Sequence, residues 1–129
     1  MSKHPDESVG TLSIIGQVIR ALRIARGVGV NQLGNSVGLE PANLSRFERG
    51  RPGGVHAAKY LDAIATRLGT KASILYAIAE FALDNPAILK KSEDLSVMVD
   101  QLTCVIKHYS NLPSNVRDQI NQVIRDNLK

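Results

Sequence analysis

The feature of the sequence that most constrains the fold is Gly38, which separates two short helical segments. Residues 31–37 span about two helical turns, and a helix of that length is marginal in water unless tertiary packing holds it. Gly38 lies just past its end, where a residue without a side chain most easily adopts a left-handed backbone. The next helix begins within three residues, so the two helices must cross steeply, and Gly34 permits the close approach. Such a pair is typical of a helix-turn-helix.

The second helix of the pair is expected over residues 41–49 and has one apolar and one polar side. Pro41 suits the first helical position, where the missing N–H has no intrahelical partner. Leu44 and Phe47 are three residues apart and are expected to face the core. The other side carries small or hydrogen-bonding residues: Ala42, Asn43, Ser45, Arg46 and Arg49. Asparagine can pair with adenine and arginine with guanine, so this side has the chemistry to read base edges.

Glu48 is an acid on the side of this helix that should be buried. It follows Leu44 by four residues and therefore shares its face. A buried carboxylate is costly unless a cation joins it. Arg23 lies next to Leu22 and four residues after Ile19 on the preceding long helix, and we expect it to pair with Glu48. The alternative is a Glu48 side chain that turns to the rim and has no fixed partner.

The positive charge of the chain is confined to one half. Residues 12–68 contain eight bases and three acids, a local charge of +5, whereas residues 69–129 contain seven of each. Most of the excess is arginine. This asymmetry points to a polyanionic partner for the first half and to another task for the second. The alternative is a basic face that is merely solvated.

Helical periodicity recurs along the chain and no alternating strand pattern is present, so we predict an all-α fold. Aromatic residues make up only 4% of the chain, so the core is expected to be aliphatic. Besides the pair above, apolar residues recur at helical spacing in residues 12–26, 56–68 and 72–83. The sequence Asp-Asn-Pro at residues 84–86 then interrupts the pattern, because the residue before a proline is disfavoured in a helix. We place a domain edge there.

Over residues 15–75 the sequence resembles the lambda-repressor-like helix-turn-helix family, of the Cro/CI or xenobiotic-response-element type. The resemblance is carried by residues 19–23, by the set Leu33, Gly34, Val37, Gly38 and Leu39, by "LSRFERG" from Leu44, and by "AIATRLGT" from Ala63. It implies a five-helix domain that binds DNA as a dimer on a pseudo-palindromic operator.

Carried over by position, the resemblance also assigns roles to single residues. Base reading is implied for Pro41, Ala42, Asn43 and Arg46. Phosphate contacts are implied for Arg49, Arg51 and the start of the helix after "RPGG", which contains His56. Gly29 and Val30 stand where the family has a polar residue and a phosphate-gripping glutamine. Either this phosphate contact is lost, or Asn31 and Gln32 take it over. Arg23 and Glu48 match the internal ion pair of the family.

The second half of the chain is expected to form two amphipathic helices. Ser92, Glu93 and Asp94 favour a helix start, and a second apolar pattern follows in residues 116–128. The two helices could fold back on each other, but pairing across a two-fold axis would bury more apolar surface. We therefore predict a homodimer formed through this apolar stripe: Leu95, Met98, Val99, Leu102, Val105, Ile106, Tyr109, Ile120, Val123 and Ile124.

The predicted organisation is thus a flexible N-terminal segment at residues 1–11, a five-helix DNA-binding domain at residues 12–83 and a two-helix C-terminal dimerisation or partner region at residues 84–129. The predicted function is that of a transcriptional regulator, a repressor of phage or bacterial genes that binds double-stranded DNA as a dimer. An antitoxin-type autoregulator, whose C-terminal region binds a toxin, is the alternative. An antirepressor could dock on that same region, and an adaptor that no longer binds DNA is a more distant possibility.

Enzymatic function is not expected. His4, His56 and His108 are scattered, and no glycine-rich phosphate loop follows a strand, so neither a metal nor a cofactor is predicted. Cys104 is the single cysteine, cannot form an internal disulfide and is expected to be a buried thiol in an apolar helix. No apolar run approaches the roughly 18 residues that a membrane span needs, and the start is not typical of a secretory signal. We expect a bacterial cytoplasmic protein that joins the nucleoid when it binds DNA.

Overall fold

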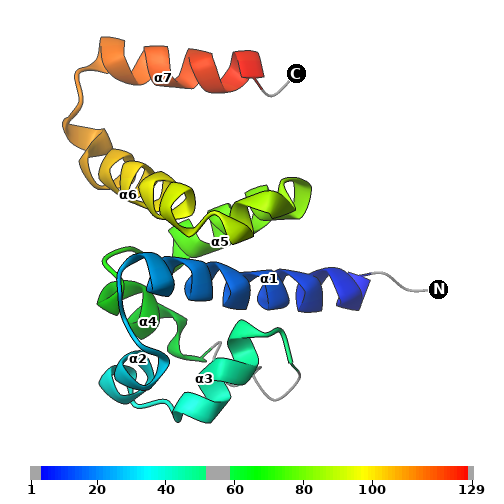
Figure 1. Ribbon diagram of the computed structural model, residues 1–129. Coiled ribbons are helices and arrows are strands. Elements are labelled where there is room, and N and C mark those ends of the chain that lie inside the picture. Colours follow the sequence, from blue (N-terminus) through cyan, green and yellow to red (C-terminus); the bar gives the residue numbers. More distant parts are fainter. Residues whose placement is uncertain (1–3, 52–58, 128–129) are drawn as a thin grey trace.

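The computed structural model describes residues 4–51 and 59–127, with side chains described from residue 13 onward. All regular elements in these ranges are helical, which confirms the predicted all-α class (Figure 1). They are α1 (His4–Ala25), α2 (Val30–Val37), α3 (Pro41–Glu48), α4 (Leu61–Arg67), α5 (Ala72–Asp84), the 3-10 helix η2 (Pro86–Lys90), α6 (Ser92–His108), the 3-10 turn η3 (Tyr109–Asn111) and α7 (Ser114–Asn127). Helix α1 begins eight residues before the expected position. None of these helices has the length and apolarity that crossing a bilayer requires.

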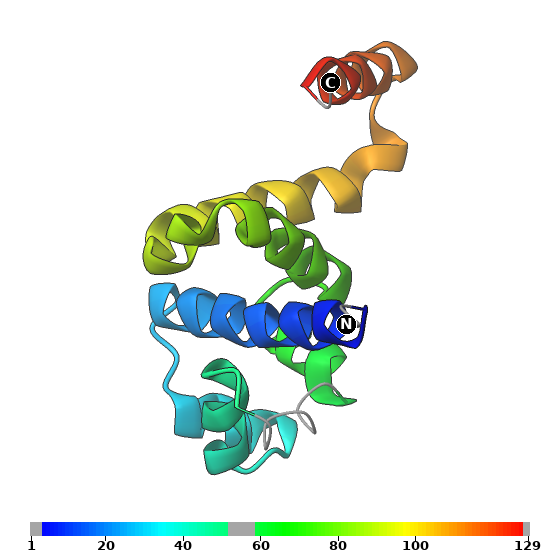
Figure 2. The same cartoon turned by 90° about the vertical axis from the view of Figure 1, so that its right-hand side faces the viewer.

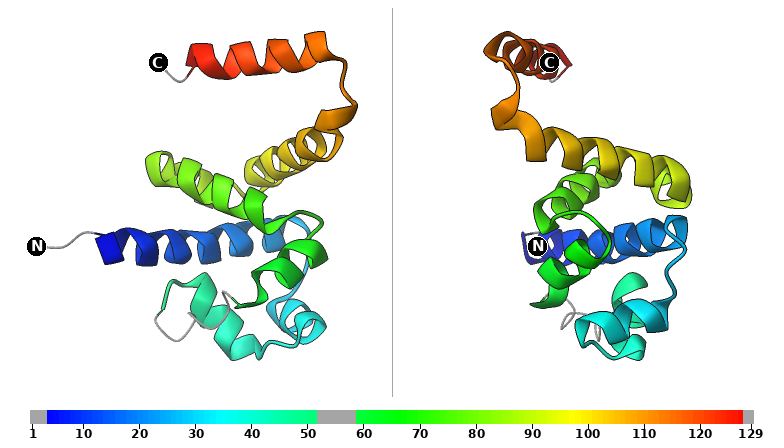
Figure 3. Two further views of the ribbon diagram at one scale, coloured as in Figure 1. Left: turned by 180° about the vertical axis from the view of Figure 1, so that it is seen from behind. Right: turned by 90° about the vertical axis from the view of Figure 1, so that its left-hand side faces the viewer.

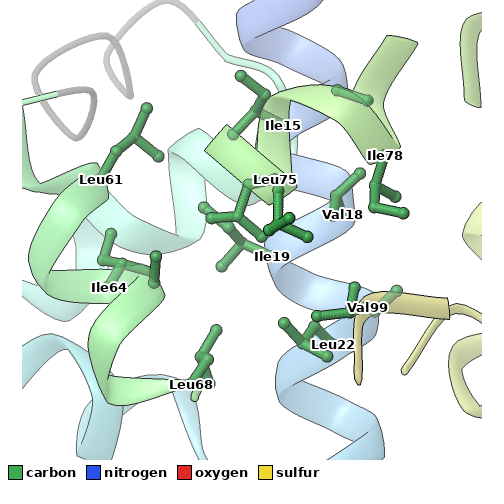
Figure 4. Packing of buried hydrophobic residues seen from close by; sticks show 14 of the residues in the cluster. Ile15, Val18, Ile19, Leu22, Leu61, Ile64, Leu68, Leu75, Ile78 and Val99 are labelled. Atoms are coloured by element: carbon green, nitrogen blue, oxygen red, sulfur yellow. The ribbon is translucent and has the colours of Figure 1, made fainter. Parts of the chain in front are cut away.

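Helix α1 is the centre of the fold. In Figures 1 and 2 it lies between α2 and α3 on one side and α5 and the start of α6 on the other. Its side chains Ile15, Ile19 and Leu22 are fully buried and meet residues of the surrounding helices (Figure 4). The core is aliphatic except for Phe47, as the composition predicted.

The turn between α2 and α3 has the geometry that the glycines predicted. Gly38 has φ of +78°, in the left-handed region that favours glycine. The N–H of Leu39 donates to the carbonyl of Gly34 at 2.8 Å and closes the end of α2. A Cβ on Gly34 would lie only 2.7 Å from the carbonyl oxygen of Leu39, so a side chain at this position would force the two helices apart.

Replacing Gly16 by alanine is expected to lower the free energy of unfolding by about 1–3 kcal/mol. A Cβ on Gly16 would clash with the carbonyl oxygen of Phe47 and lie 2.7 Å from its carbonyl carbon. Both atoms belong to the backbone of α3, so α3 would have to move away from α1. At an unhindered helix position the same change would stabilise by roughly 1 kcal/mol. Urea denaturation followed by circular dichroism measures the difference.

The matched control is Gly29→Ser, because a Cβ on Gly29 meets nothing within 4 Å and serine is a favoured residue before a helix. Its stability should stay the same or rise slightly. A Gly16→Ala variant that is more stable than the unchanged protein would contradict the close packing of α1 on α3.

The first half of α6 belongs to the core, which corrects part of the predicted dimer surface. Leu95 and Val99 are fully buried in the same cluster as the residues of α1, and Met98 packs against that cluster. Leu95 and Val99 are therefore covered by their own chain and offer no surface to a second copy, and Met98 is half-buried. The apolar stripe extends beyond them, but its first part faces α1 and α5.

Polar contacts hold α6 in the same place. Arg26 on α1 donates to the Asp100 carboxylate at 2.7 Å. The hydroxyls of Thr70 and Thr103 lie 2.7 Å apart, and Thr103 donates to the carbonyl of Val99 at 2.6 Å. The break at residues 84–86 is therefore a turn after which the chain packs back on the same core, to which α6 contributes Leu95 and Val99.

The end of α6 and the whole of α7 present uncovered apolar side chains. Leu102, Val105 and Ile106 are 37%, 38% and 53% exposed, and Val123 and Ile124 are 60% and 51% exposed. Helix α7 contains no buried residue and stands away from the rest of the molecule (Figures 1 and 3).

Two contacts of Tyr109 join α7 to the segment before it. The hydroxyl of Tyr109 lies 3.4 Å from the Asn121 amide oxygen, and the Arg117 guanidinium lies 5.9 Å from the Tyr109 ring centre. Ile120 and Tyr109 are half-buried. The predicted dimer residues thus fall into a buried, a half-buried and an uncovered group.

Candidate nucleic-acid interface

The polar side of α3 is exposed to solvent. Ala42 and Arg46 are exposed, and Pro41 and Asn43 are half-exposed. Arg46 donates from Nη1 to the Asn43 amide oxygen at 3.1 Å, so these two polar side chains touch each other. The structure thus brings together, on one side of α3, the four residues for which base reading was predicted, and all four are exposed or half-exposed.

Arg49 and Arg51 lie at the end of α3. Both are exposed, and Arg49 donates to the Ser45 hydroxyl at 2.9 Å. Gly50, between them, has φ of +71°, and the Arg51 N–H bonds to the Arg46 carbonyl at 2.9 Å, which closes the turn. Two guanidinium groups therefore leave the last turn of the helix beside its polar side.

The other predicted phosphate-binding residues are only partly described. Asn31 and Gln32 are exposed in the first turn of α2. The Gln32 amide oxygen accepts from the Gly29 N–H at 3.4 Å, which leaves its NH₂ group to donate outward. His56 lies outside the described residues.

The buried side of α3 is fixed to α1 by the expected ion pair. Arg23 donates from Nε and from its Nη2 to the two carboxylate oxygens of Glu48, at 2.8 and 2.9 Å, and from Nη1 to the Val28 carbonyl at 2.9 Å. Glu48 is 4% exposed. The hydrogen bond with Glu48 raises the pKa of Arg23 against the opposing effect of burial, so the guanidinium stays charged. The pair sets the position of the last turn of α3, and with it that of Arg46 and Arg49.

A cleft of about 870 Å³ opens beside this ion pair, between α1, α3 and η2. Its lining contains Gln17, Arg20, Val30, Ser45, Arg49, Arg51, Pro86, Leu89 and Lys90, together with the pair itself. Four of these polar residues, Gln17, Arg20, Ser45 and Lys90, were not predicted as site residues. Arg20 lies one helical turn before Arg23, a spacing that could have indicated it. Nothing in the local sequence places Lys90 near α3, because only the tertiary fold brings η2 there.

The described residues contain no group of three or more His, Cys, Asp or Glu side chains that could hold a metal ion. Cys104 is exposed, in contrast to the expected burial, because α6 turns only its first half toward the core. The exposed side of α3 and the cleft beside it offer mainly hydrogen-bond donors and positive charge.

Residues 14–75 match a protein family described as a helix-turn-helix domain. The matched segment runs from α1 to the first turn of α5 and includes α3 with its exposed polar side. No curated protein and no solved structure matches the chain significantly.

Proposed function

We propose that this chain, in which residues 14–75 form a helix-turn-helix domain, is a regulator that reads duplex DNA with α3. The domain itself indicates a DNA-binding regulator. The observation that carries the proposal is the two-sided character of α3. Its polar side, with Asn43 and Arg46, is open to solvent, while Glu48 on the opposite side is clamped to α1. A helix held in this way can enter a major groove with its reading side outward.

Base reading is assigned to the side chains on the open side of α3. Arg46 can donate two hydrogen bonds to a guanine edge, and Asn43 can bond an adenine. When Asn43 instead keeps its contact with Arg46, four of the five guanidinium N–H donors remain free for a base. Ala42 can touch a thymine methyl group. Pro41 has no side-chain donor, so its contribution is a close approach to the groove.

Phosphate contacts are assigned to the residues around this reading surface. Arg49 and Arg51 leave the end of α3, and Asn31 and Gln32 begin α2. Contacts of this kind orient a protein on the duplex without specifying sequence. The proposed binding mode is the one expected of the Cro/CI type, and the proposed role is repression of phage or bacterial genes.

Dimerisation is proposed through the uncovered apolar side chains of α6 and α7. A second copy would cover Leu102, Val105 and Ile106 together with Val123 and Ile124, which are all at least one-third exposed. Two joined domains would then occupy the two halves of a pseudo-palindromic operator. The same exposed surface supports the alternative function, in which a toxin or antirepressor binds there.

Selection from a random DNA pool tests the reading function. The unchanged protein should enrich an inverted repeat, and Arg46→Ala should bind that repeat about 1–3 kcal/mol more weakly and lose preference at one base position per half-site. Arg49→Ala is the matched control, because it also removes an exposed arginine from the same helix end. It should weaken binding to all sequences alike and lower the salt slope by about 1. A pool without an enriched repeat, or an Arg46→Ala variant with unchanged base preference, would contradict the assignment.

A further inference from the structure

The cleft beside α3 concentrates positive charge from separate parts of the chain. Arg20 comes from α1, Arg49 and Arg51 from the end of α3, and Lys90 from η2. The one carboxylate in the lining, Glu48, is already engaged by Arg23. None of the four other cations forms an ion pair with a carboxylate among the described residues. The cleft therefore carries uncompensated positive charge.

These four cationic side chains are all exposed. Like charges gathered in one cleft repel each other, and an anion placed between them relieves that repulsion. A cleft lined by exposed cations from three different parts of the chain suits an extended anion better than a small enclosed one. Arg49 and Arg51 belong at once to this cleft and to the proposed edge of the reading surface, so the two surfaces are continuous.

The backbone at Lys90 is held in place by the residues around it. Ile88 and Leu89 are partly buried against the hydrophobic core, and the N–H of Lys91 donates to the Ile88 carbonyl at 3.0 Å. The η2 segment is thus anchored on the body of the molecule. The ammonium group is carried at the edge of the cleft by a packed segment rather than by a loose loop.

We propose that Lys90 on η2 and Arg20 on α1 form an additional phosphate-binding contact that holds the DNA backbone alongside the groove entered by α3. The inference rests on the proposed function and extends it beyond the matched helix-turn-helix segment, since Lys90 lies after residue 75. It also places a DNA contact two residues before the start of α6. The duplex would then touch the part of the chain that leads to the proposed dimer helices.

The test compares Lys90→Gln and Arg20→Gln with Lys91→Gln in the full chain. Lys91 is the adjacent exposed lysine and is not part of the cleft lining, so the control removes the same charge from the same region. Affinity for duplex DNA is measured over a series of salt concentrations. Lys90→Gln and Arg20→Gln should each lower the slope of log affinity against log salt by about 0.9, with base preference unchanged. Lys91→Gln should leave the slope unchanged.

Equal slopes for Lys90→Gln and Lys91→Gln, with selective DNA binding intact, would overturn this inference and leave the proposed function standing. An unchanged protein that selects no DNA sequence would instead overturn the proposed function. Titration with inorganic phosphate separates a small-anion site from a DNA contact. Phosphate binding at micromolar concentration that Lys90→Gln abolishes would assign the cleft to a free anion and overturn the DNA contact.

Discussion

Replacing Val123 and Ile124 together by glutamine will weaken binding to an inverted-repeat duplex by about 10²- to 10⁴-fold. The two side chains are 60% and 51% exposed, so the fold of the single chain does not depend on them. Glutamine is neutral and a good helix former, which preserves α7 and the net charge. On the proposed dimeric binding mode, the loss arises because two α3 helices that are no longer joined must each find their half-site separately. Sedimentation velocity should show a monomer, and fluorescence anisotropy should show the weakened binding.

Two comparisons make this result specific. Binding to a duplex with a single half-site should not change, because each α3 stays intact. Gln122→Ala is the matched control: Gln122 lies on the polar side of α7, where it donates to Asp126, and its loss should leave the dimer unaffected. A doubly substituted protein that still sediments as a dimer would place the interface elsewhere. An unchanged protein that is already a monomer would favour the alternative, in which α7 binds another protein.

Arg23→Met is expected to lower the free energy of unfolding by about 3–5 kcal/mol, the range for removing one partner of a buried ion pair. Methionine fills much of the space of the arginine stem but leaves the Glu48 carboxylate buried without a cation. It also removes the donor to the Val28 carbonyl. Because the pair joins α1 to α3, the variant that remains folded should also read its operator less well. Urea denaturation followed by circular dichroism measures the stability.

The double variant Arg23→Met with Glu48→Leu separates a buried charge from a general packing defect. It should recover most of the lost stability, since an apolar pair of similar volume often replaces a buried ion pair without loss. Asp100→Asn breaks the other ion pair among the described residues, that between Arg26 and Asp100. Because the Asp100 side chain is 59% exposed, this change should lower the free energy of unfolding by less than about 1 kcal/mol. Equal losses of unfolding free energy for Arg23→Met and Asp100→Asn would contradict the larger contribution to stability that is assigned to the buried pair.

The helix-turn-helix could be predicted because its signals are local, and the ion pair because Arg23 and Glu48 each lie on the apolar face of their own helix. Gly38 marks a backbone conformation, Pro41 marks a first helical turn, and Glu48 interrupts an apolar face at a known spacing. Each of these depends on a few neighbouring residues and on helix geometry alone. The open side of α3 followed from the same spacing, since residues opposite Leu44 and Phe47 must point away from the core.

The division of the α6 stripe could not be predicted in the same way. Leu95 and Val99 share the periodicity of Leu102 and Ile106, yet the first two are buried against α1 and the latter two are exposed. The basic cleft could not be predicted for the same reason. Lys90 lies near the end of α3 only because η2 packs on α1. By itself the sequence determined that the chain is helical, where most of its helices lie and which side of each helix is apolar, although α1 begins earlier than its apolar pattern indicated. Only the tertiary structure decided which surface covers each apolar side, because periodicity defines a face but carries no information about the distant segment that packs on it.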